Sequence, residues 1–112
     1  MGLMLERLHV ALAALTERCW HYVAVPNTTP PYIVWAEDGD NDLMAGNVHA
    51  ERCLTGTVDL YTKKESDPLV MFIPEALEGI GAAYHLNSVQ YEEETGLVHY
   101  EWVWDCLLYT SD

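Results

Sequence analysis

Hydrophobic residues near the start of the chain recur at three- and four-residue steps, the spacing of one helix face. The residues between them are largely polar or charged, so residues 3–19 are predicted to form an amphipathic helix. Such a helix needs a surface to cover, and packing on the protein's own sheet is favoured over packing on a partner. Its core side is predicted to carry Leu5, Leu8, Leu12, Leu15 and Cys19.

Shorter segments rich in β-branched and aromatic residues predict strands. The first is ended by PNTTPP, where three prolines remove amide donors. Gly56 is expected to mark a bulge or bend. The last two strands form a hairpin around the turn EETG. The predicted strands are residues 20–25, 32–37, an extended stretch within 48–62, 83–93 and 97–105.

A second helix is predicted from the segment ESDPLV to about Gly79. Ser66 or Asp67 can cap it, and Pro68 fits the first turn, where its missing amide donor costs nothing. Pro74 is expected to kink the helix or delay its start. The element order is therefore α-β-β-β-α-β-β, a mostly antiparallel sheet packed against two helices in the α+β class.

The last predicted strand carries an aromatic row. Val98, Tyr100, Trp102 and Trp104 occupy alternate positions and therefore share one face of the strand. A half-exposed strand of this composition would be prone to aggregation. We therefore assign Tyr100, Trp102 and Trp104 to the core and not to a ligand site.

The segment EDGDND places three aspartates at alternate positions, as a calcium-binding loop does. Counted from Asp38, however, the sixth position is Leu43 and the twelfth is His49, where an EF-hand requires Gly and Glu. Turns favour the same Asp, Asn and Gly residues. The segment is predicted to be a solvated acidic loop between the second and third strands, and a weak cation site is the less favoured alternative.

The chain contains no motif that predicts catalysis. There is no G-x-S-x-G, no phosphate-binding glycine loop and no H-E-x-x-H. Glu92, Glu93 and Glu94 are consecutive, so on a strand they point to opposite faces, and a solvated hairpin tip is favoured over a paired-carboxylate site. The histidines are dispersed and lack the further ligands that zinc requires. We expect no enzyme, no metal and no cofactor.

The charge balance restricts the possible partners. Five Lys and Arg face eighteen Asp and Glu in 112 residues, for a formal net charge of −13. Without a basic patch, neither direct nucleic-acid binding nor attachment to an anionic membrane is expected. No segment has the pattern of a signal peptide or a membrane span. Three cysteines without metal or redox spacing are typical of a reduced, cytoplasmic protein.

A family resemblance rests on the segments PPYIVWAEDGDND, GTVDLYTKKESDPLV and NSVQYEEETGLVHYEW. The pattern resembles a family of small tail-completion proteins of long-tailed bacteriophages and prophages. These proteins are often described as minor capsid or tail components and are similar to tail terminators. The resemblance covers about residues 3–105, and its last segment is the most specific because Tyr, an acidic run, Thr-Gly and Tyr-Glu-Trp occur in fixed order.

The resemblance implies a structural role in the virion, without catalysis, after synthesis in the host bacterial cytoplasm. Subunits of such proteins form a ring, commonly a hexamer, on the head-proximal end of the tail tube and help to join tail to head. The implied partners are further copies of the chain, the tail-tube protein and the head–tail connector protein. A monomeric prophage-encoded binding module and a neck adaptor are the alternatives.

The acidic loop over residues 37–47 and the hairpin tip over residues 92–96 are the expected interface, because neither has the apolar content to pack itself. Both are expected to be mobile in the free subunit and to become ordered on contact with a neighbour. The expected interface residues are Glu37, Asp38, Asp40, Asp42, Glu92, Glu93 and Glu94.

The final residues are predicted to lie outside the domain. The segment CLLYTS resembles the in-frame translation of a sequencing-library adapter, and the alternation of the last strand breaks at Cys106 and Leu107. We therefore expect a single tail-completion domain over residues 1–105 and a non-native read-through tail over residues 106–112. A natural extension of the strand is the alternative.

Overall fold

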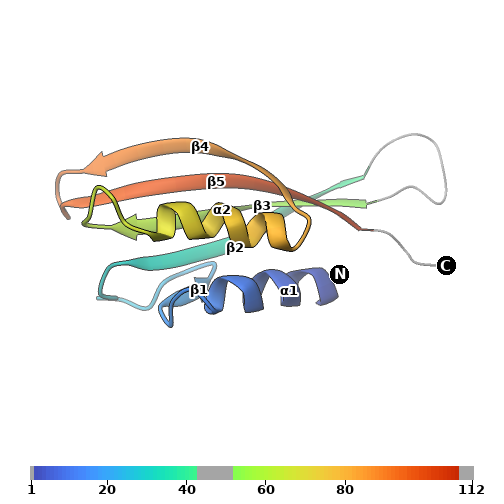
Figure 1. Ribbon diagram of the computed structural model, residues 1–112, viewed down its shortest axis with the longest axis horizontal. Coiled ribbons are helices and arrows are strands. Elements are labelled where there is room, and N and C mark those ends of the chain that lie inside the picture. Colours follow the sequence, from blue (N-terminus) through green and yellow to red (C-terminus); the bar gives the residue numbers. More distant parts are fainter. Residues whose placement is uncertain (1, 43–51, 109–112) are drawn as a thin grey trace.

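Five strands form one sheet in the order β1-β2-β3-β5-β4, accompanied by two helices, in this computed structural model (Figure 1). The structure describes residues 2–42 and 52–108. All neighbouring strands are antiparallel except β1, which runs parallel to β2. The predicted element order and α+β class are therefore confirmed. The elements are α1 (Gly2–Ala13), β1 (Cys19–His21), β2 (Tyr32–Asp42), β3 (Arg52–Thr62), α2 (Leu69–Gly79), β4 (Ala83–Glu92) and β5 (Leu97–Leu108).

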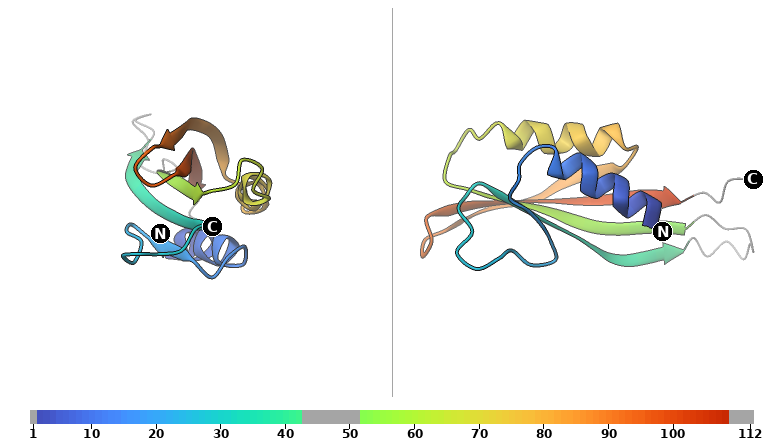
Figure 2. Two further views of the ribbon diagram at one scale, coloured as in Figure 1. Left: turned by 90° about the vertical axis from the view of Figure 1, so that its left-hand side faces the viewer. Right: turned by 90° about the horizontal axis from the view of Figure 1, so that it is seen from below.

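Both helices cover the same face of the sheet, as the views in Figure 2 show. Alternate residues of the central strands point towards the helices and form the core with them. Among the described elements, no helix covers the opposite face. No described helix is long and apolar enough to cross a membrane. The buried hydrophobic core comprises Leu8, Leu12, Ile33, Trp35, Leu54, Val58, Leu60, Leu69, Ile73, Leu77, Ala82, Trp102 and Trp104.

Gly56 leaves room for the largest of these side chains. It stands opposite Trp104 in the register of β3 and β5. A Cβ atom built on Gly56 would lie 2.4 Å from Cζ2 of Trp104 and 2.1 Å from the carbonyl oxygen of Ala36. The irregularity expected near Gly56 lies on the partner strand, as a register shift between Glu37 and Gly39 of β2.

The N-terminus of α2 is fixed by Asp67, which is buried although it carries a carboxyl group. Its Oδ1 accepts a hydrogen bond from the backbone N–H of Leu69 at 2.9 Å, and its Oδ2 accepts one from the Thr62 hydroxyl at 2.6 Å. Asp67 therefore ties the end of β3 to the start of α2. The helix begins at Leu69 and continues through Pro74, so the proline does not delay its start.

The first two elements are shorter than predicted. The backbone N–H of Leu15 bonds to the carbonyl oxygen of Leu12 at 3.0 Å, in a tight turn that follows α1. Cys19 therefore belongs to β1 and not to the helix, and burial raises the pKa of its thiol to about 11. β1 ends at His21 because Tyr22 has a φ of 73°, which no strand residue adopts.

The acidic segment is where the structure differs most from the prediction. β2 continues to Asp42 and pairs with β3 along its whole length, so the prediction of a loop that begins at Glu37 was wrong. Backbone pairing with β3 outweighs the turn preference of Asp, Asn and Gly. Residues 43–47 of the predicted loop lie outside the described residues.

β5 also extends beyond its predicted end. It continues past Asp105 to Leu108, and its last residues pair with the start of β3. The alternation of hydrophobic and polar residues that breaks at Cys106 therefore does not end the strand. The boundary between a domain over residues 1–105 and a read-through tail stays a prediction.

Candidate functional site

Glu37, a predicted interface residue, is held by two neighbours from the end of β1. Its Oε1 lies 2.8 Å from Nε2 of His21, and its Oε2 accepts a hydrogen bond from the Tyr22 hydroxyl at 2.6 Å. The His21 ring stacks between Tyr22 and Trp35, with ring centroids 4.0 and 3.9 Å away. The carboxylate is therefore part of a fixed corner of the fold.

The electrostatics of this corner follow from the same hydrogen bonds. Burial alone would raise the pKa of Glu37, but the hydrogen bonds from Tyr22 and His21 outweigh burial, and the pKa is lowered. The hydrogen bond to Glu37 raises the pKa of the Tyr22 hydroxyl. The same bond helps to hold Tyr22 in its left-handed backbone conformation, which is costly for a bulky side chain.

The remaining acidic residues of this segment lie on β2 at and after the register shift. Asp38 is exposed, and its Oδ1 accepts a hydrogen bond from the Thr55 hydroxyl at 2.9 Å. Asp40 and Asp42 stand opposite Leu54 and Arg52 in the backbone register. Their side chains lie outside the described part of the structure. Among the side chains that are described, no group of three or more His, Cys, Asp or Glu could hold a metal ion.

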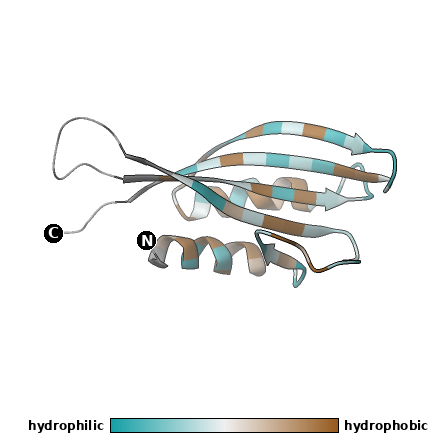
Figure 3. Cartoon of the chain, turned by 180° about the vertical axis from the view of Figure 1, so that it is seen from behind, coloured by the Kyte–Doolittle hydropathy of each residue, from teal (hydrophilic) through white to brown (hydrophobic). Residues whose placement is uncertain are grey.

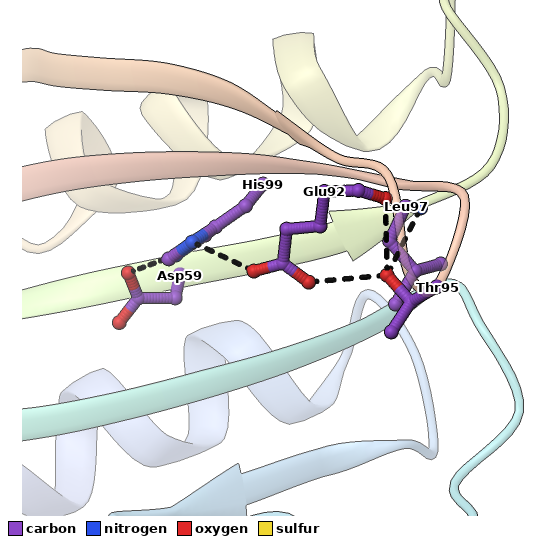
Figure 4. Close-up of polar contacts among 5 residues, drawn as sticks. All are labelled: Asp59, Glu92, Thr95, Leu97 and His99. Carbon is purple, nitrogen blue, oxygen red and sulfur yellow. Dashed lines mark hydrogen bonds and ion pairs between the residues drawn. The ribbon is translucent and has the colours of Figure 1, made fainter.

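The hairpin tip is a turn closed by its own hydrogen bonds (Figure 4). The Thr95 hydroxyl donates to Oε1 of Glu92 at 3.1 Å and accepts from the backbone N–H of Leu97 at 3.2 Å. The N–H of Gly96, which has a φ of 73°, donates to the Glu92 carbonyl oxygen at 2.8 Å. Glu93 is exposed, as is its neighbour Glu94.

His99 joins this tip to the middle of the sheet. Its Nε2 lies 2.7 Å from Oδ1 of Asp59 on β3, and its Nδ1 lies 3.9 Å from Oε2 of Glu92 on β4 (Figure 4). The hydrogen bond to Asp59 raises the pKa of His99, and burial, which opposes the charged form, is outweighed. Glu92 of the acidic hairpin tip thus contacts a histidine on the face of the sheet that the helices do not cover.

Three rings on this open face stand side by side across three strands. Tyr32, Tyr61 and His99 are direct neighbours in the strand register. The ring centroids of Tyr32 and Tyr61 lie 4.8 Å apart, and those of Tyr61 and His99 lie 4.2 Å apart, with nearly parallel planes. Burial and the charge of Asp59 raise the pKa of Tyr61 to about 12. No local sequence pattern predicts this row, because only the strand order brings its members together.

The six residues assigned to the core are all buried or partly buried. Leu8, Leu12, Trp102 and Trp104 are at most 3% exposed. Leu15 and Tyr100 are partly buried and pack against the core, and the Tyr100 hydroxyl donates a hydrogen bond to the Glu65 carbonyl oxygen at 3.3 Å.

The two helices leave between them a shallow, largely apolar groove of about 440 Å³, lined by Ala11, Leu15, Phe72, Glu75, Ala76, Gly79 and Ile80.

Comparison with known proteins adds a likeness of fold. No family model matches the sequence, and no curated protein matches it either. Among solved structures, the chain is similar to a chain in the virion of a native gene transfer agent particle. The TM-score is 0.54 at 11% sequence identity, and the match covers 93% of this chain and 90% of that chain. The two chains therefore share a fold over nearly their whole lengths.

Proposed function

We propose that this protein is a non-catalytic structural subunit of a phage-like virion, which caps the tail tube as a ring and helps to join tail to head. One observation carries the proposal: the fold matches that of a gene transfer agent virion chain over 93% of this chain and 90% of that chain. Its partners are further copies of itself, the tail-tube protein and the head–tail connector protein. Its place is the head-proximal end of the tail.

The charge of the chain suits a ring through which DNA passes. With a formal net charge of −13, the subunit repels the phosphate backbone and does not retain it. Carboxylates that line or fringe the lumen would keep the duplex moving. The exposed carboxylates of Glu93 and Glu94 at the hairpin tip are available for such a position.

The polar contacts of the described residues support a structural role. Each histidine–carboxylate pair joins different strands: His21 on β1 binds Glu37 on β2, and His99 on β5 binds Asp59 on β3. Both imidazoles are also stacked on aromatic rings, which restricts their movement. The contacts therefore strengthen the pairing of strands.

Light scattering coupled to size-exclusion chromatography tests the proposal. The purified chain is run alone at increasing concentration, and then with the tail-tube protein of the same phage or prophage. We expect a closed oligomer, a hexamer, alone or on the tube ends. A strictly monomeric chain that does not bind the tube would contradict the proposal and favour a monomeric binding module. A ring that binds only the connector protein would favour a neck adaptor.

A further inference from the structure

β4 is an edge strand whose outer side is open. It stands at the end of the sheet order and pairs only with β5 among the described strands. A register shift between Leu86 and Ser88 interrupts it, but residues 88–92 keep a regular register with β5. Residues 83–91 contain no Asp, Glu, Lys, Arg or Pro, the residues that commonly protect an edge strand. The outward N–H and C=O groups of residues 88–92 can therefore pair with an added strand.

One face of this edge is apolar. Val89 and Tyr91 are 50% and 65% exposed, and Leu86, before the register shift, is 48% exposed. The register pairs Leu86 with Trp102 and Val89 with Tyr100, two residues of β5 that belong to the core or pack against it. These apolar side chains therefore lie on the side of the sheet that carries the helices, but beyond their cover. Figure 3 shows hydrophobic positions along this outer strand.

The other face is polar and leads to the acidic hairpin tip. Gln90 and Glu92 occupy the alternate positions and therefore lie on the face that the helices leave open. Glu93 and Glu94 follow directly and are exposed. With the described residues, neither of these two carboxylates forms an ion pair or a hydrogen bond. Both are therefore free to receive a cation from outside the chain.

This half of the chain has no cation of its own to balance them. All five Lys and Arg lie within residues 1–64, whereas residues 65–112 hold more than half of the eighteen Asp and Glu. α2, β4 and β5 therefore carry no Lys or Arg. A strand added to β4 is attracted to the tip if it brings a cation, and repelled if it brings a further carboxylate.

The described edges of a second copy do not fit this requirement. Besides β4, the free edges are β1 and the stretch of β2 beyond it, residues 36–42, which pair with β3 alone among the described strands. Neither stretch contains Lys or Arg, and the β2 stretch is itself acidic. The chemistry of β4 therefore favours a segment of a different protein.

We propose that β4 binds an extended segment of a partner protein in which apolar residues alternate with Lys or Arg. Backbone hydrogen bonds to residues 88–92 hold the segment. Its apolar side chains pack on Val89 and Tyr91, and a cation contacts the carboxylates of the hairpin tip.

This inference goes beyond the proposed function and does not depend on ring formation. It assigns the tip carboxylates to a protein contact instead of a lumen. The net charge of −13, on which the repulsion of DNA rests, is unaffected.

A synthetic peptide tests the assignment. The probe is a short, fluorescently labelled peptide of alternating Val and Lys, and fluorescence anisotropy measures its binding to the purified wild-type chain. One control peptide has the same composition with Val and Lys in two blocks. The other is the alternating peptide with every backbone amide N-methylated, which removes its donors. Hydrogen exchange compares the amides of residues 88–92 on β4 with those of residues 19–21 on β1.

We expect the alternating peptide to bind, and both control peptides to bind at least about tenfold more weakly, because they cannot form the backbone pairing. With the alternating peptide bound, the amides of residues 88–92 should exchange more slowly, and those of residues 19–21 should be unchanged.

A pair of double variants tests the contact with the tip. Glu93→Gln with Glu94→Gln should weaken binding of the alternating peptide by at least about threefold, the loss of two exposed ion pairs. Glu6→Gln with Glu17→Gln removes the same charge from exposed positions near the N-terminus and should bind like wild type. Circular dichroism confirms folding of both variants.

Three results would overturn the inference: no binding at millimolar concentrations of the alternating peptide, equal binding of the block peptide, or slowed exchange on β1 instead of β4. Equal binding of the block peptide would show attraction by charge alone. An equal loss in the two double variants would assign the effect to net charge and would reject the contact with the tip.

Discussion

Gly56 and Trp104 face each other across β3 and β5, and the indole ring occupies the space that any side chain at Gly56 would need. Trp104 is completely buried, so its ring cannot move towards solvent. Gly56 does not have a positive φ, so its backbone conformation does not require glycine. Glycine is required because there is no space for a Cβ atom.

Gly56→Ala should destabilise the protein by at least about 1–3 kcal/mol, the usual cost of overpacking a core. The added Cβ would contact both the Trp104 ring and the Ala36 carbonyl oxygen, and the backbone atom cannot rotate away. Urea denaturation measures the change in the free energy of unfolding. Gly79→Ala is the control, because a Cβ atom there meets nothing within 4 Å. Equal stability of the two variants would show that the core can relax around Gly56.

Trp102→Ala should cost about 3–5 kcal/mol and is expected to prevent folding at physiological temperature. The Trp102 side chain is 3% exposed and packs in the core beside Tyr100, with ring centroids 5.9 Å apart. Thermal denaturation measures the effect, with the exposed Met71→Ala as control. An unchanged melting temperature together with lost assembly would instead identify this face as a partner surface.

The contact between His99 and Asp59 predicts a pH dependence with a defined sign. The pKa of His99 is raised by Asp59, with Glu92 and Glu101 adding to the shift, so the folded state binds a proton more tightly than the unfolded state. The resulting stability is fully present below the unfolded value of 6.5 and is lost as the pH rises through the higher folded pKa. Urea denaturation at a series of pH values should show this loss.

The variants His99→Gln and Asp59→Asn should both remove this component of the pH dependence. His85→Gln, on the exposed edge strand β4, should leave it unchanged. A wild-type profile that is retained in His99→Gln would assign the dependence to other groups.

Tyr22→Phe should raise the pKa of Glu37, because the variant loses a hydrogen bond that stabilises the carboxylate. An NMR titration of the Glu37 carboxyl carbon measures the shift. Tyr84→Phe removes a comparable hydroxyl that donates to Glu78 at 2.5 Å, and should leave Glu37 unchanged. An unchanged pKa of Glu37 in Tyr22→Phe would mean that the Tyr22 hydroxyl does not stabilise the carboxylate.

The sequence predicted those elements that depend on residues close to one another in the chain. The alternation around EETG predicted the hairpin of β4 and β5, and the spacing of Leu8 and Leu12 predicted the buried side of α1. The end of β1 was not predictable, because it depends on the φ of Tyr22, which contacts with His21 and Glu37 stabilise. Tyr is not a residue that signals a left-handed conformation.

The candidate site was less predictable than the fold. The acidic residues that follow Glu37 were expected in a loop because Asp, Asn and Gly are turn formers, and only pairing with β3 places them on a strand. The contact between His99 and Asp59 joins residues 40 positions apart, and depends on β5 lying next to β3. No short-range pattern contains that information.

The pairing of β3 with β5 also has a consequence for the kinetics of folding. These central strands are separated in the chain by α2 and β4, so the long intervening segment must close before their pairing is gained. The hairpin of β4 and β5 is local and can form early, whereas the completion of the sheet waits for the slower, distant pairing. A newly made chain is therefore expected to pass through a period in which the hairpin exists while β3 and β5 are not yet paired, and exposed strand edges favour aggregation during that period.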